Sequence, residues 1–192
     1  LDRIHGGDAD ILVGTQMLAK GHDFPKLTVV GVLGSDAALF AADWRAPERL
    51  FAQLMQVAGR AGRAELMGEV LIQTQYPDHP LYTALVAHNY PGFAAALLRE
   101  REQAGFPPYA FQAMLRAEAP EMATAIAFLT TACALPVVRD HCGVVLYDPV
   151  PMKLSRLANL ERGQLLVESQ SRPALQAFLP RWREGIEAIK AP

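Results

Sequence analysis

The sequence predicts two domains, an α/β domain with a parallel sheet over residues 1–106 and a small α+β domain over residues 107–192. Three apolar runs in the first domain are rich in β-branched residues, which suits buried parallel strands; they lie at residues 11–13, 27–33 and 69–74. A helical pattern separates the last two runs. The second domain alternates apolar and polar residues and predicts the order β-α-β-β-α.

The boundary between these patterns lies in the segment Gly105-Phe106-Pro107-Pro108-Tyr109. Two consecutive prolines cannot continue a helix and they stiffen the connection. We therefore place the end of the first domain at Phe106.

A polar loop follows the first predicted strand, which ends at Gly14-Thr15. The loop carries Lys20, His22 and Asp23 before Pro25. Loops at the carboxyl ends of parallel strands are where α/β proteins bind ligands. The alternative interpretation is a solvated connector that leads into the next strand.

A helix begins near Pro47, because Leu50, Leu54 and Val57 follow at helical spacing. Its end carries two arginines among glycines, in the segment Gln56-Val57-Ala58-Gly59-Arg60-Ala61-Gly62-Arg63. A guanidinium is a planar fork that can hold phosphate oxygens, and glycines let the backbone come close to such a ligand. The segment predicts an anion site. The alternative is a surface turn with solvated arginines.

The remaining pattern predicts helices at residues 79–88 and 92–103 and, in the second domain, a half-buried strand at 110–118. A helix is expected at 120–135, with an inner stripe of Met122, Ile126, Leu129 and Cys133. Two strands are expected at 144–147 and 164–168, separated by a long loop that includes residues 148–157. The last helix is expected at about 173–189, with Phe178 and Trp182 in the core and a kink or interruption at Pro180.

Composition restricts the function. A formal net charge of −2 argues against a protein that coats nucleic acid through global positive charge, so any polyanion site is local. Cys133 and Cys142 are too few and too far apart for a zinc ribbon, and no secretory signal or long apolar span is present. These features predict a soluble, cytoplasmic protein with no membrane partner and no metal site in this chain. Because Leu1 is not a methionine and a strand follows almost at once, we expect a piece of a longer protein.

The loop and the arginine segment together resemble the fifth and sixth conserved motifs of superfamily 2 helicases, in order and separation as well as in residues. Within that superfamily, the sequences of these motifs most resemble those of the PriA (primosomal protein N′) family, the bacterial replication-restart helicases. The matching segments are Gly14-Thr15-Gln16-Met17-Leu18-Ala19-Lys20-Gly21-His22-Asp23-Phe24-Pro25, the arginine segment, and Ala104-Gly105-Phe106-Pro107-Pro108-Tyr109. The resemblance covers the whole chain, although the second domain matches through architecture and position. It implies that the first domain is a partial RecA-like second helicase lobe.

The resemblance also implies roles in ATP hydrolysis. Arg60 and Arg63 would reach the γ-phosphate of ATP held on the other lobe, and Gln56 would orient the same site or the attacking water. Asp23 would lie near the ribose and the network between the lobes. Gly21 and Gly59 would complete the nucleotide-binding residues of this chain.

For DNA, the resemblance implies that Gly14 and Thr15 contact the phosphates of a single strand, assisted by Lys20 or His22. The second domain would contact branched DNA and help to bind single-stranded DNA-binding protein. Its candidate DNA contacts are three basic side chains, those of Lys153, Arg156 and Arg162. Tyr147 could offer a ring on which a base stacks. Because acidic residues are interleaved with the basic ones, a solvated mixed-charge face is the alternative.

Several parts of such a helicase are absent from the 192 residues, which contain no Gly-x-x-x-x-Gly-Lys-[Ser/Thr] loop, acidic magnesium motif or zinc-binding cysteine cluster. The resemblance implies that ATP with Mg²⁺ is bound mainly by the missing lobe, and that zinc belongs to the full-length protein and not to this chain. The expected function is the C-terminal part of a 3′-to-5′ DNA helicase that recognises stalled forks and restarts replication with other primosome proteins. We expect no ATPase activity from the chain alone.

Two alternatives stay open at this point. The chain could be the second lobe of another superfamily 2 DNA repair translocase. It could also be a non-catalytic module that binds DNA or protein.

Overall fold

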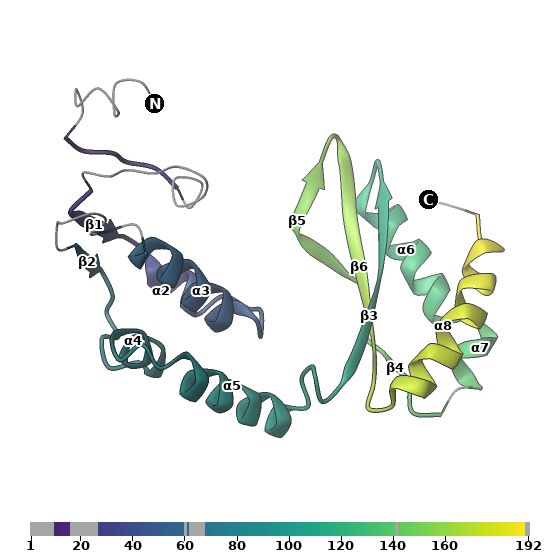
Figure 1. Ribbon diagram of the computed structural model, residues 1–192. Helices are drawn as coiled ribbons and strands as arrows, with labels where there is room; N and C mark the ends of the chain where they lie inside the picture. The colour runs from purple at the N-terminus through teal and green to yellow at the C-terminus, as the bar shows by residue number, and fades with distance from the viewer. Residues whose placement is uncertain (1–9, 16–26, 60, 62–67, 141, 191–192) are drawn as a thin grey trace. The chain divides into compact units, whose positions relative to one another are not determined.

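The computed structural model describes residues 10–15, 27–59, 61, 68–140 and 142–190 (Figure 1). The chain divides into two compact units, residues 1–98 and 99–192. The change of unit therefore falls within a helix, and the domain boundary after residue 106 stays a prediction.

The first unit has a two-stranded parallel sheet with helices. Its elements are β1 (Val29–Val32), α2 (Ser35–Leu39), α3 (Ala46–Ala58), β2 (Glu69–Ile72), α4 (Pro80–Val86) and α5 (Tyr90–Ala104), the last of which continues into the second unit. Strand β1 pairs with β2 from Val29 opposite Glu69 to Val32 opposite Ile72. The parallel pair and the helix between its strands confirm the α/β character predicted for this part.

The core of the first unit lies between the sheet and α3, α4 and α5. Leu50, Phe51 and Leu54 occupy one face of α3 and are buried, as the helical spacing predicts. Phe51 stacks on Phe93 of α5 with ring centroids 4.8 Å apart. Leu81 of α4 closes the core from the side of the second strand.

The predicted strand at residues 11–13 is wrong. These residues form no strand, and the side chains of Ile11 and Val13 are 83% and 88% exposed. A buried strand needs a backbone partner and a covering layer, and the described residues supply neither here. The apolar run alone could not reveal this.

The second unit consists of a four-stranded sheet and the helices that accompany it. After the end of α5 its elements are β3 (Phe111–Ala119), α6 (Met122–Cys133), α7 (Pro136–Arg139), β4 (Val145–Leu146), β5 (Val150–Leu157), β6 (Leu160–Ser169) and α8 (Arg172–Glu187). Strand β6 is central: it pairs antiparallel with β3 from Phe111 opposite Ser169 to Ala119 opposite Glu161, and its other edge holds β4 and β5.

The order β-α-β-β-α expected for this unit is wrong in two respects, because the short helix α7 follows α6 and the predicted loop at 148–157 contains strand β5. Strands β5 and β6 form a hairpin whose two turn residues, Ala158 and Asn159, have φ of 51° and 65°. Two consecutive positive φ angles are typical of the tight turn that matches the twist of a hairpin, and Asn favours them. The prolines at 149 and 151 made this strand resemble a loop in sequence, and a register irregularity between Pro151 and Arg156 interrupts its pairing with β6.

Helices α6 and α8 pack on one face of this sheet (Figure 1). Their contacts with the sheet are apolar and fully buried; the core includes Leu129, Leu165, Val167, Phe178 and Trp182. The indole Nε1 of Trp182 donates to the Ala132 carbonyl at 2.9 Å, so the buried polar atom is satisfied. Phe178 and Trp182 thus lie in the core, as predicted, and α8 continues through Pro180 without interruption.

The inner stripe of α6 is rotated from the predicted one. Ala125, Leu129 and Ala132 are buried, whereas the predicted Met122, Ile126 and Cys133 are half-buried. The helix crosses the sheet at Gly163, where an added Cβ would lie 3.0 Å from a methyl carbon of Leu129. At so close a crossing small side chains face the sheet, and larger ones flank it.

Within the described part of the chain, no helix is both long and apolar enough to span a membrane.

Candidate functional site

Ser35 and Asp36 link α2 to the segment that follows β2 and to α4. Asp36 Oδ1 accepts from Thr74 Oγ1 at 2.6 Å, and Oδ2 accepts from the Gln75 amide at 2.9 Å. Ser35 Oγ donates to the Gln73 carbonyl at 3.0 Å and lies 2.8 Å from Tyr82 Oη of α4. This network fixes the start of α2 to the end of β2, and thereby the connector that leads into α3.

Hydrogen bonds from Thr74, and then from Gln75, lower the pKa of Asp36 below its usual value. A depressed folded-state pKa stabilises the fold above the unfolded value of about 4, and the contribution is lost as pH falls through the folded pKa. We expect Asp36→Asn to lower the melting temperature at pH 7, and the gap from the unsubstituted chain to narrow below about pH 4. Circular dichroism melts at pH 7, 5 and 3 measure this.

The exposed carboxylate of Asp78, in the same unit, supplies the control for that series. Asp78→Asn should leave the melting temperature nearly unchanged at each pH. A gap for Asp36→Asn that stays constant from pH 7 to pH 3 would contradict the ionic role of this carboxylate.

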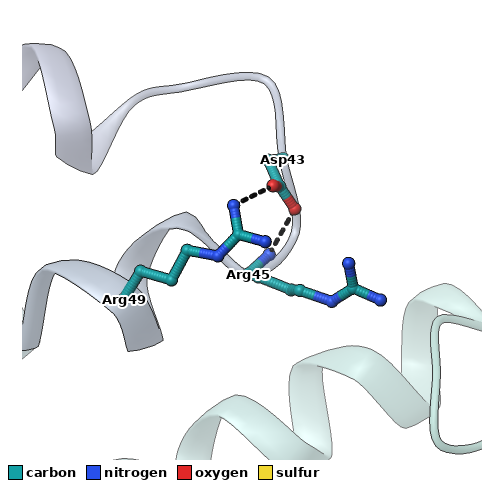
Figure 2. A network of polar contacts seen from close by, with 3 residues as sticks. All are labelled: Asp43, Arg45 and Arg49. Carbon is teal, nitrogen blue, oxygen red and sulfur yellow. Dashed lines mark hydrogen bonds and ion pairs between the residues drawn. The ribbon is translucent and has the colours of Figure 1, made fainter. Parts of the chain in front are cut away.

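The connector before α3 carries a second polar network (Figure 2). Asp43 Oδ1 accepts from the Arg45 backbone amide at 2.9 Å, and Oδ2 accepts from Arg49 at 2.8 Å. The Arg45 guanidinium lies over the Trp44 ring, with its central carbon 4.3 Å from the ring centroid. Figure 2 shows the Arg45 side chain pointing away from Asp43 and Arg49.

Helix α3 positions Gln56 at its exposed face, opposite the buried Leu50 and Leu54. The helix ends at Ala58, and the Gly59 amide donates to the Met55 carbonyl. Gly59 has an ordinary φ of −69°, and an added Cβ would meet its nearest atom at 3.5 Å. The helix end itself therefore does not require a glycine here.

The other candidates in the first unit divide into two groups. Gly14 and Thr15 are exposed in the irregular segment 10–15. Six residues lie outside the described part of the chain, namely Lys20, Gly21, His22, Asp23, Arg60 and Arg63. Their roles stay predictions.

In the second unit, the three basic candidates lie on the β5–β6 hairpin but differ in their surroundings. Lys153 is exposed, and the Arg156 side chain is 67% exposed with Glu161 3.8 Å away. The Arg162 side chain is only 15% exposed, and its Nε donates to Glu118 of β3 at 2.9 Å. Lys153 and Arg156 thus face solvent, whereas Arg162 ties β6 to β3.

Tyr147, the possible stacking residue, is held by a carboxylate. Its hydroxyl donates to Glu168 Oε1 at 3.1 Å, and Gln112 donates to Oε2 at 2.7 Å. The bond to Glu168 raises the pKa of Tyr147. The ring is half-exposed and fixed in position.

Sequence reasoning missed the Ser35–Asp36 network and the Arg45–Trp44 stack. The available signal for the first was its place after a predicted strand, since Gly34-Ser35-Asp36 follows residues 27–33 directly. The partners Thr74 and Tyr82 are 38 and 46 residues away from Asp36, so only the fold brings them together.

Two protein families match this chain in succession. Residues 1–65 match the helicase conserved C-terminal domain, and residues 102–191 match the primosomal protein N C-terminal domain. The two matches thus define a helicase C-terminal domain followed by a domain of primosomal proteins.

Individual relatives extend this similarity over nearly the whole chain. The replication restart protein PriA of Haemophilus influenzae is 44% identical over 185 residues, which cover 96% of this chain and 25% of that protein. The proteins of the same name from Synechocystis and Bacillus subtilis are 42% and 36% identical, over 89% and 91% of this chain and 21% and 22% of theirs. The chain belongs to the PriA family, and it spans about a quarter of the length of these relatives.

Proposed function

We propose that this chain is the C-terminal part of an ATP-dependent 3′-to-5′ DNA helicase that recognises stalled or branched replication forks and restarts replication through primosome assembly. The supporting observation is the similarity to replication restart proteins over 96% of the chain. The first unit would be part of a RecA-like second lobe, in which α3 carries the sixth helicase motif. The protein would act in the cytoplasm, with forked and single-stranded DNA, single-stranded DNA-binding protein and other primosome proteins as partners.

The residues of this chain suit a polyphosphate. Gln56 on the exposed face of α3 begins a segment that ends in Arg60 and Arg63, and amide and guanidinium groups are donors to phosphate oxygens. When bound, ATP with Mg²⁺ supplies the transferable phosphoryl group. Arg60 and Arg63 would neutralise charge on it, Gln56 would orient the attacking water, and Asp23, with Gly21 and Gly59, would line the ribose side. The other lobe would hold most of the nucleotide.

On the DNA side, Gly14 and Thr15 would contact the phosphates of one strand through a backbone amide and a hydroxyl, with Lys20 and His22 beside them. The exposure of residues 14 and 15 is compatible with that role. In the second unit, Lys153 and Arg156 would contact the fork directly. Arg162 would act through its bond to Glu118, which holds the hairpin on the sheet.

The hairpin contact can be tested with forked DNA. We expect the double change Lys153→Ala and Arg156→Ala to weaken fork binding by about tenfold and to reduce the slope of log affinity against log salt by one to two, because about one counterion is released per phosphate contact. Fluorescence anisotropy at 50 to 200 mM salt measures both quantities.

A matched control for this test is Arg183→Ala, which removes an exposed arginine of α8 that pairs with Glu187 at 3.4 Å. It should leave affinity and salt slope unchanged. An unchanged affinity of the hairpin variant at low salt would remove the hairpin from the proposed interface.

The activity itself can be tested on the full-length protein. It should unwind a fork with a 3′ single-stranded tail when ATP and Mg²⁺ are supplied, and leave a substrate with only a 5′ tail intact. ATP-dependent movement along duplex DNA without strand separation would instead favour a repair translocase.

A further inference from the structure

In the first unit, one exposed aromatic ring lies at the connector between α2 and α3 and another lies after β2. Phe40 follows α2 directly, and its side chain is 57% exposed; Tyr76, after β2, is 48% exposed. Their ring centroids lie 4.8 Å apart in an edge-to-face pair. Phe40 also meets the His79 ring edge-on, with centroids 6.4 Å apart. Large rings that stay about half exposed at the surface are a candidate interaction site.

The same connector carries the stacked Arg45. Asp43, whose carboxylate Figure 2 shows, accepts from the Arg45 amide and from Arg49, so both of its oxygens are engaged. The Arg45 guanidinium lies over Trp44 instead. Stacking on a ring leaves the donors at the edge of a guanidinium available to a phosphate.

The connector is held in one shape by its backbone. The Asp43 amide donates to the Ala41 carbonyl at 2.7 Å, and the Ala46 amide donates to the Asp43 carbonyl at 2.8 Å. In α2, which precedes the connector, the Asp36 carboxylate accepts hydrogen bonds from Thr74 and Gln75. Phe40 and Arg45 therefore lie on a hydrogen-bonded connector, and the neighbouring Asp36 and Asp43 carboxylates are bonded within the protein.

We propose that this connector is a binding site for single-stranded DNA, in which Phe40 and Tyr76 stack on bases and Arg45 contacts a backbone phosphate. The inference rests on the proposed DNA-binding function and adds a contact in the first unit outside the helicase motifs. The exposed ring pair and the exposed Arg45 supply the mixture of stacking and phosphate contacts by which proteins hold a single strand without reading its sequence. The site lies where the parallel strands of the unit end, which is the ligand-binding edge of such sheets.

Binding can be followed with the 192-residue chain and a labelled oligothymidylate of about twenty nucleotides, longer than the sites that such surfaces occupy. Anisotropy reports affinity, and tryptophan emission reports the site. Trp182 is buried and bonded to Ala132, so quenching by the oligonucleotide should come from Trp44. In the Trp44→Phe chain the quenching should disappear.

The variants keep the fold while removing single features. Phe40→Leu with Tyr76→Leu keeps apolar bulk but removes both stacking faces, and should weaken binding by about tenfold. Arg45→Ala should lower the salt slope by about 0.7, and Arg45→Lys should restore the slope with only part of the affinity. Arg183→Ala again serves as the control, and circular dichroism verifies that each variant is folded.

Three results would overturn the proposal. First, the proposed site is ruled out if neither Phe40→Leu with Tyr76→Leu nor Arg45→Ala changes the affinity for the oligonucleotide. If the Lys153 and Arg156 changes still weaken fork binding in that case, the proposed function stands without this site. A loss in Arg183→Ala equal to that in Arg45→Ala shows attraction by charge alone. A chain that binds neither the oligonucleotide nor forked DNA at 50 mM salt contradicts the inference and the DNA-binding role together.

Discussion

Replacing Arg60 or Arg63 by Ala in the full-length protein should reduce DNA-stimulated ATP hydrolysis by about a thousandfold or more, because an arginine supplied from a second lobe stabilises the charge that develops on the transferred phosphoryl group. Steady-state phosphate release with saturating single-stranded DNA measures this effect. Fork affinity should stay the same, since neither side chain is proposed to touch DNA.

The conservative variants Arg60→Lys and Arg63→Lys separate charge from geometry. Lysine keeps the positive charge but lacks the planar fork, so the lysine variants should recover little turnover. Near-normal rates in either alanine variant would contradict the assigned role of that arginine. Loss of fork binding along with turnover would mean that the arginines serve the fold or the DNA instead.

The second large effect is expected in the core of the C-terminal unit. Leu129 of α6 is fully buried against the sheet at Gly163. Leu129→Ala should lower the free energy of unfolding by about 3 kcal/mol, because the close crossing of helix and sheet limits collapse around the cavity. Urea denaturation followed by the fluorescence of Trp182, which lies in the same core, measures it.

The chain offers a matched leucine for comparison. Leu154 on β5 is 58% exposed, and Leu154→Ala should change the free energy by no more than about 0.5 kcal/mol. Equal losses in the two variants would contradict the assignment of the core to the covered face of the sheet.

Sequence patterns predicted the parts of the fold that depend on local periodicity. The helix that begins near Pro47 and the core positions Phe178 and Trp182 appear as expected. The strands near residues 27–33 and 69–74 also form, but the burial predicted for them is wrong, because Val29 and Leu71 are 50% and 53% exposed. The helix and these core positions have a hydrophobic repeat that a packed element covers, whereas the two strands are only partly covered by the described residues. The mixed α/β class followed from the order of these elements.

The errors arose where distant contacts decide the outcome. Residues 11–13 have the composition of a strand but no partner among the described residues, whereas residues 150–157 contain a proline and several polar residues yet pair with β6. The inner stripe of α6 depends on how closely the helix approaches Gly163. None of these contacts is visible in a single segment.

The candidate site divides in the same way. The helicase motifs could be found because their residues are consecutive, and the resemblance supplied their roles. By contrast, the bond from Thr74 to Asp36, the ring pair of Phe40 and Tyr76, and the restraint of Arg162 by Glu118 join residues from separate elements. Charge in the sequence could not distinguish Arg162 from its neighbour Arg156.

The proposed division of the ATP site between two lobes is tested most directly by ATP hydrolysis with the purified 192-residue chain in the presence of single-stranded DNA. The sequence contains the arginines but no phosphate-binding loop, so we expect no phosphate release above background, while the full-length protein turns over under the same conditions. Measurable DNA-stimulated hydrolysis by the 192-residue chain, abolished by Arg60→Ala, would contradict the claim that these arginines complete a site held mainly by another lobe.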